Sequence, residues 1–180
     1  MKKFSILTIL VSLTLSISSQ HLKPVDEGSL VKFYIKNLGF TVTGTFSGLQ
    51  GGIEFNPNNL SACNFNVSVD ASTINTSIAK RDRDLKKENY FDVNKFPRLS
   101  FISVKISKGP NTSVLMMAGN ITIKGVTKSI SFPFKALLQK DGYLFTGEFD
   151  LNRRDFKVGG NSLILSDDLH VTLEIHAKNS

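Results

Sequence analysis

The sequence is poor in the residues on which disulfide scaffolds and metal sites depend. It has one cysteine, Cys63, so no intramolecular disulfide can form and the fold must be stabilised by its own core. Only three histidines are present, His21, His170 and His176. In a strand over residues 169–178 the last two would lie about 20 Å apart, which is too far to share a metal ion. The sequence therefore predicts no metal site and no cofactor.

Motifs of known catalytic chemistry are also missing. The chain holds no G-x-S-x-G nucleophile turn, no C-x-x-C pair and no H-E-x-x-H zinc motif. The adjacent carboxylates of Asp167 and Asp168 would point to opposite faces of a strand, which does not suit paired acid–base chemistry. We therefore predict that the protein is not an enzyme.

Long hydrophobic runs are absent except at the start of the chain. Lysines at positions 2 and 3 precede an apolar stretch over residues 4–15, and small serines follow within residues 16–19. This order predicts a signal peptide over residues 1–20, cleaved near residues 18–20, with an uncleaved anchor as the alternative. One domain over residues 21–180 would then be exported to the periplasm or the outside of the cell. No later stretch is apolar enough to span a bilayer.

The charge of the chain is moderately positive. Residues 1–20 hold two of the 22 basic residues and none of the 15 acidic ones, so the mature net charge is +5. Such a charge favours anionic partners, including phosphate head groups and a transient contact with a membrane surface, although it also serves solubility. Nucleic acid is not expected, because no recognised binding motif is present. A homodimer is compatible with the sequence.

Short runs of alternating apolar and polar residues dominate the remainder. Residues 30–37, 64–71 and 169–178 show this period of two most clearly, which is typical of strands with one apolar face. Residues 78–88 are charged and predict a surface helix, because Ile78 and Leu85 would share a helical face. Strands of this kind predict a sandwich or a barrel. Further strands are expected at residues 41–49, 53–56, 98–108, 114–124, 126–140 and 143–151.

Phenylalanine and clustered basic residues supply the candidate binding groups. The chain has 14 phenylalanines, three tyrosines and no tryptophan. The phenylalanines in the strand patterns fit either a packed core or the wall of a lipid-sized cavity. Basic residues gather at residues 80–87 and again at Arg153, Arg154 and Lys157. Each cluster fits either an anionic contact or a solvated face with local ion pairs.

Four stretches carry a family resemblance in their order and spacing. They are VKFYIKNLG at residues 31–39 with GTF at 44–46; RDRDL at 81–85 with YFD at 90–92 and FPRLSF at 96–101; GNITIKGVT at 119–127; and NRRDF at 152–156. Together they resemble the YceI-like family of exported, polyisoprenoid-binding and lipid-binding proteins. The second stretch is the most specific. One departure is Asn37, where many members carry histidine before Leu-Gly.

The resemblance implies an all-β fold: an extended, lipocalin-like antiparallel β-barrel with one or two short helices between strands. It also implies an apolar channel that holds a polyisoprenoid or a fatty-acid-like lipid. The polar head group would contact Arg81, Arg83, Arg153 and Arg154. The channel would be lined by Phe33, Ile35, Phe46, Phe65, Val67, Val69, Phe101, Ile121, Phe132, Phe134 and Leu173.

Three functions are open on this basis. The leading one is non-catalytic binding of a long-chain lipid for storage or transport, which predicts a continuous lumen with an opening. The second is a filled barrel that acts through its outside as an envelope stress or interaction protein, which predicts close interior packing and an outer apolar patch. The third is an enzyme acting on a lipid, which needs two or more titratable groups converging in the lumen.

Overall fold

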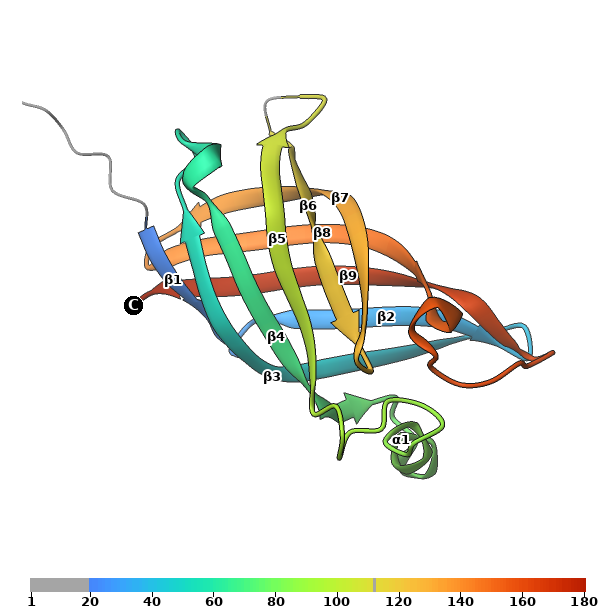
Figure 1. The fold of residues 1–180 in the computed structure, drawn as a ribbon. Helices are drawn as coiled ribbons and strands as arrows, with labels where there is room; N and C mark the ends of the chain where they lie inside the picture. Colours follow the sequence, from blue (N-terminus) through green and yellow to red (C-terminus); the bar gives the residue numbers. More distant parts are fainter. Residues whose placement is uncertain (1–19, 112) are drawn as a thin grey trace, which may run out of the picture.

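The described part of the chain folds into a closed antiparallel β-barrel with one α-helix (Figure 1). The structure, a computed structural model, describes residues 20–111 and 113–180. The predicted signal peptide thus lies outside the described residues, apart from Gln20. The strands are β1 (Gln20–Pro24), β2 (Leu30–Asn37), β3 (Phe40–Phe55), β4 (Asn64–Asn75), β5 (Arg98–Lys108), β6 (Leu115–Ile123), β7 (Val126–Gln139), β8 (Gly142–Asn152) and β9 (Leu165–Asn179).

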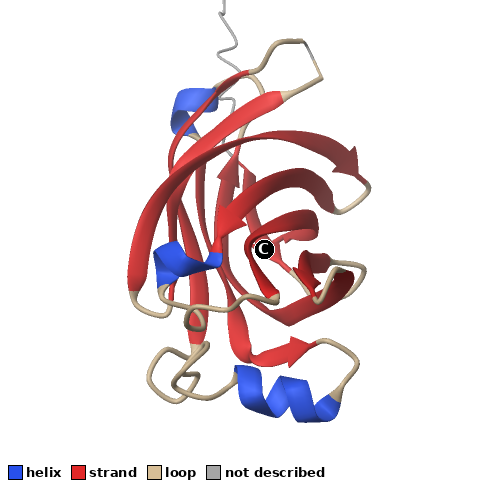
Figure 2. Cartoon of the chain, turned by 90° about the vertical axis from the view of Figure 1, so that its right-hand side faces the viewer, coloured by secondary structure: helices blue, strands red, loops and turns tan. Residues whose placement is uncertain are grey.

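The strand order explains how the barrel closes. Hydrogen-bonded neighbours run β1-β3-β2-β9-β8-β7-β6-β5-β4, and an additional pairing of β3 with β4 joins the two sides. Every pairing between these strands is antiparallel. Figure 2 shows the strands wrapped around a shared interior, with α1 outside them at one edge. The predicted barrel is therefore confirmed, and β2 and β5 have the predicted bounds.

β1 and β2 occupy successive places between the same two neighbours. β2 pairs with the first half of β3 and with most of β9, whereas β1 pairs with the far ends of both strands. Leu22 is fully buried there, opposite Ile53 on β3. The alternation did not predict this five-residue strand, because its position depends on pairing partners that are distant in sequence.

β3 is one long strand where the sequence predicted two. Gly48 lies in a bulge, because the pairing of β3 with β4 shifts register between Ser47 and Gln50, whereas Gly51 and Gly52 pair regularly with β4. Gly48 has φ of 72° and Gly51 has φ of 123°, a backbone conformation that side chains disfavour. A Cβ at Gly51 would also lie 2.0 Å from the carbonyl oxygen of Asn66. The bulge lets β3 bend around the barrel without ending.

The short helices lie between strands at the barrel ends. They are η1 (Leu60–Ala62), α1 (Ala79–Leu85) and η2 (Arg153–Phe156). The helix predicted at residues 78–88 is therefore present but shorter. Among the described residues, none of the helices has the length and apolar character needed to cross a membrane.

Candidate functional site

A cavity of about 620 Å³ lies inside the barrel. This volume falls within the roughly 300–1,000 Å³ that small-molecule sites usually have. Leu169, Val171, Leu173 and Ile175 line it at every second position of β9. Six residues of strand rise about 20 Å, so the cavity is elongated along the strands. Its wall is chiefly apolar because the period of two places one apolar face of each strand inside.

All eleven apolar residues expected at the channel wall line this cavity. They come from seven different strands, and barrel closure brings them together around one space. Residues outside this predicted set also face the cavity, among them Val31, Phe149 and Val171. The eleven are Phe33, Ile35, Phe46, Phe65, Val67, Val69, Phe101, Ile121, Phe132, Phe134 and Leu173.

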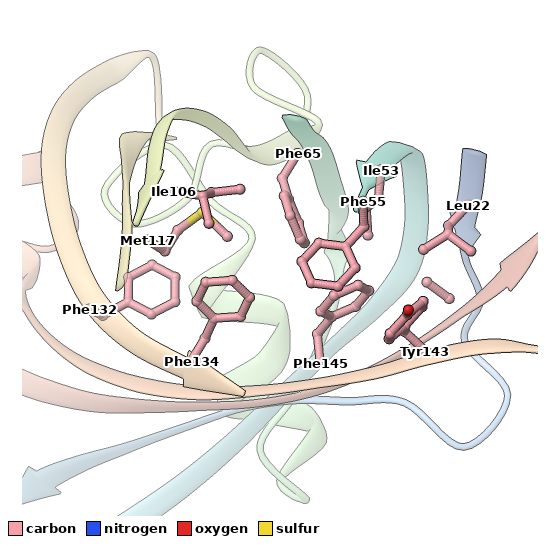
Figure 3. Close-up of a cluster of buried hydrophobic side chains, with 11 residues drawn as sticks. Leu22, Ile53, Phe55, Phe65, Ile106, Met117, Phe132, Phe134, Tyr143 and Phe145 are labelled. Carbon is pink, nitrogen blue, oxygen red and sulfur yellow. The ribbon is translucent and has the colours of Figure 1, made fainter. Parts of the chain in front are cut away.

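Packed aromatic rings close one end of the cavity (Figure 3). Phe55 is almost fully buried and lies edge-on to Tyr143 and Phe145, with ring centroids 5.0 and 5.2 Å apart. Phe65 continues the group toward the lumen, 5.1 Å from Phe145. Edge-to-face contacts of this kind add stability beyond the apolar area they bury. The end near β1 is therefore a solid core, and the cavity begins beyond it.

The cavity reaches the surface beside α1. Ile78 and Lys80 both line it, and both are exposed. Phe91 also lines it and packs edge-on against Phe46 on β3, with centroids 5.5 Å apart. Residues 78–91 thus form one side of an opening. Phe156 of η2 lies in a separate buried apolar cluster, against which Phe91 also packs.

Side-chain hydrogen bonds fix the start of α1 at this opening. Arg81 donates from Nε to Thr76 Oγ1 and from Nη2 to the Thr76 carbonyl, each at 2.7 Å. Asp82 accepts the Thr76 amide at 2.8 Å. The hydrogen bond and charge of Lys87 lower the pKa of Asp84, which also lines the cavity. The opening therefore carries cations together with a carboxylate that is already paired.

Arg153 lines the cavity but is 4% exposed, and its donors bind the protein itself. Its guanidinium holds the loop between η2 and β9, because its partners are the carbonyl oxygens of residues 158, 160, 165 and 166 and the carboxylate of Asp167. Arg83 and Arg154 are exposed and do not line the cavity. Of the four expected head-group contacts, Arg81 and Arg153 are thus at the cavity.

Asn37 presents an acceptor to the cavity near Tyr90, one of the residues of the opening. Its Oδ1 atom is buried and has no hydrogen-bond partner among the described residues. The residue lines the main cavity and a smaller adjoining one that Tyr90 and Arg153 also line. In the sequence, Asn37 stood out only as a departure from the family pattern. Asn37 lies two residues after Ile35 and four after Phe33 on β2, and this spacing indicates that it faces the same side as they do.

Metal-ligating groups and the thiol of Cys63 are the remaining candidates for chemistry. Across residues 20–111 and 113–180, no group of three or more His, Cys, Asp or Glu side chains is placed to hold a metal ion. The Cys63 thiol lies outside the cavity, and burial raises its pKa. A thiol of this kind packs as a small apolar group.

Comparisons with known proteins agree with this architecture. The model of the YceI-like domain matches residues 22–177. The UPF0312 protein YE1254 of Yersinia enterocolitica is 29% identical over 83% of this chain and 73% of its own length. The Protein YceI of Salmonella arizonae is 33% identical over 64% of this chain and 60% of its own length. A solved polyisoprenoid binding domain from Saccharophagus degradans has the same fold, with a TM-score of 0.71, 12% identity, and coverage of 90% of this chain and 99% of that one.

Proposed function

Because this chain belongs to the YceI-like family, we propose that it binds a long-chain apolar lipid, such as a polyisoprenoid, and stores or carries it unchanged. The observation that carries this proposal is the elongated apolar cavity, closed by aromatic rings at one end and open at the other. A long chain would enter at α1 and extend toward Phe65. The likeness of the fold to a polyisoprenoid binding domain supports the same ligand class.

Burial of the ligand chain would supply the binding energy. Each methylene removed from water contributes about 0.8 kcal/mol, and a long chain offers many of them. Ordering a flexible chain offsets part of this gain. The balance favours long chains over short ones, because each added methylene adds burial inside the barrel.

The polar end of the ligand would stay at the opening. A polar group buried without a partner costs free energy, and the inner wall offers mostly apolar side chains. Asn37 Oδ1 provides an acceptor for a hydroxyl or amine, and Lys80 and Arg81 provide charge for an anionic group. Cleavage of residues 1–20 would place this carrier in the periplasm or outside the cell.

Titration of delipidated protein with a fluorescent polyene fatty acid tests the proposal. We expect saturable uptake of about one ligand per barrel, and displacement by unlabelled polyprenols that improves as their chains lengthen. A folded protein that takes up none of these ligands would instead support a filled barrel that acts through its outer surface.

A further inference from the structure

Four exposed apolar side chains project from two neighbouring turns at one end of the barrel. Leu38, in the turn between β2 and β3, and Phe40, the first residue of β3, are 64% and 77% exposed. Leu163 and Ile164, in the segment before β9, are 106% and 53% exposed. The amide of Leu38 donates to the carbonyl of Ile164 at 2.8 Å, so the two turns are joined (Figure 1). We refer to these four residues as the apolar tip.

The backbone conformation of Leu38 is unusual for a leucine. Asn37 pairs with Phe40, which leaves Leu38 and Gly39 as a two-residue hairpin turn. Their φ angles are 52° and 80°, and hairpin turns with both angles positive favour asparagine, aspartate or glycine. A leucine there is strained in its backbone and places its side chain in solvent. Neither the positive φ angle of Leu38 nor its exposed side chain contributes to packing of the core.

The apolar tip is continuous with the opening of the cavity. Asn37 precedes Leu38, Leu165 follows Ile164, and both Asn37 and Leu165 line the cavity. A surface in contact with the tip would therefore face the opening at short range.

Two lysines lie on the segments that carry the apolar tip, and the nearest carboxylates, Asp167 and Asp168, are both hydrogen-bonded, the second to Asn152. Residues 36–41 and 157–166 contain Lys36 and Lys157, both exposed, and no carboxylate. The next carboxylate along the chain, Asp167, is bonded to Arg153. Exposed apolar side chains flanked by lysines suit the interface of an anionic bilayer, where the side chains enter the acyl boundary and the lysines meet phosphate groups.

We propose that the apolar tip docks the barrel on the surface of an anionic phospholipid bilayer, with the cavity opening turned toward the lipids. The exchange of a lumenal lipid through this contact rests on the proposed function, whereas the contact itself does not.

A second copy of the chain suits the apolar tip less well. Stable interfaces bury about 800 Å² per partner and use roughly 20–30 residues on each side. The tip offers four apolar side chains on two projecting turns. Insertion into a bilayer requires only that these side chains leave water.

Flotation with vesicles of phosphatidylcholine and phosphatidylglycerol tests the docking. We expect the mature protein to float with these vesicles, less in high salt, and less with phosphatidylcholine alone. Phe40→Ser combined with Leu163→Ser should weaken vesicle binding by at least about tenfold, because two inserted side chains are lost. Lys36→Glu should weaken it by roughly fivefold or more.

Val104→Ser combined with Leu138→Ser is the matched control, since these side chains are 71% and 70% exposed away from the tip. The control should bind vesicles as the wild type does. Absence of wild-type flotation, or equal loss in the control and tip variants, would overturn the docking. So would a tip variant that floats normally but loses self-association in size-exclusion chromatography.

Uptake of the fluorescent fatty acid, measured on the same variants without vesicles, separates the two proposals. The tip variant should retain uptake within about twofold, because its substitutions lie outside the cavity. Flotation by a wild type that takes up no fatty acid would refute the lumenal function and leave the docking supported.

Discussion

The ring of Phe33 lies directly over Gly44, its partner on the neighbouring strand. A Cβ on Gly44 would lie 2.2 Å from Cζ of Phe33, so only glycine leaves room for the ring in this position. Phe101 lies as closely over Gly119, which is two residues from its paired residue Ile121 on β6: a Cβ on Gly119 would be only 2.4 Å from Cζ of Phe101. Two of the large rings at the cavity thus lie against the barrel wall, and the lumen stays open beside them.

Gly44→Ala should displace Phe33 and destabilise the barrel. We expect a loss of about 1–3 kcal/mol in the free energy of unfolding, as in other overpacked cores. In a Phe33→Ala background the same substitution should cost much less, because the clash is gone. Urea denaturation of the four proteins measures this coupling. Gly52→Ala is the control, since the nearest atom to its Cβ would be 3.7 Å away, and it should change stability by less than about 1 kcal/mol.

Leu173→Trp should weaken binding of a long lipid by at least roughly tenfold, because the indole is larger than the leucine side chain and takes the space of about two ligand methylenes. Leu173 lines the cavity, whereas Thr172 belongs to the opposite face of β9. Thr172→Trp should therefore bind as the wild type does in the fluorescent fatty acid titration. Equal affinity of the two folded variants would show that the ligand lies elsewhere.

Arg153→Ala should destabilise the protein by about 2–5 kcal/mol, because buried carbonyls lose their donor. The neighbouring Arg154 is exposed and lies 3.9 Å from Asp167, so Arg154→Ala should cost less than about 1 kcal/mol. Thermal denaturation measures both costs. Hydrogen exchange should also show faster opening of residues 157–165 in Arg153→Ala alone, and similar exchange in both variants would contradict the assigned role.

Asp70 should titrate below its ordinary pKa. The side chain and the amide of Ser72 hydrogen-bond to its carboxylate and lower its pKa, with the amide at 2.7 Å. A lowered folded pKa gives stability that is present above the ordinary value of about 3.9 and is lost as the pH falls through the folded value. The stability difference between wild type and Asp70→Asn should therefore shrink in acid. NMR titration checks the pKa, which should rise in Ser72→Ala.

The alternation of side chains predicted the strands and one apolar face for each, because one buried face imposes a period of two. It fitted a sandwich as well as a barrel, and the family resemblance selected the barrel. Glycine was less informative in β3, since it is compatible with a turn and with a bulge. Gly48 and Gly51 suggested turns, yet the strand continues through them. The short β1 gave no local signal, because the burial of Leu22 depends on Ile53, which is distant in sequence.

The candidate site was predictable in composition but not in shape. Packed rings and an open lumen use the same aromatic residues: Phe65 and Phe134 belong to the solid core and also line the cavity. The basic residues were harder to place. Arg153 and Arg154 are adjacent in sequence, yet only tertiary contacts bury the first and leave the second in solvent.

Native mass spectrometry of the mature protein purified from its source, followed by organic extraction, tests the central claim most directly. A lumenal carrier should show a stoichiometric added mass that organic solvent releases as a long-chain lipid. The extracted protein should regain a mass shift with added polyprenol or fatty acid. A clean mass for the protein alone, with no uptake of either lipid by the folded barrel, would contradict the account.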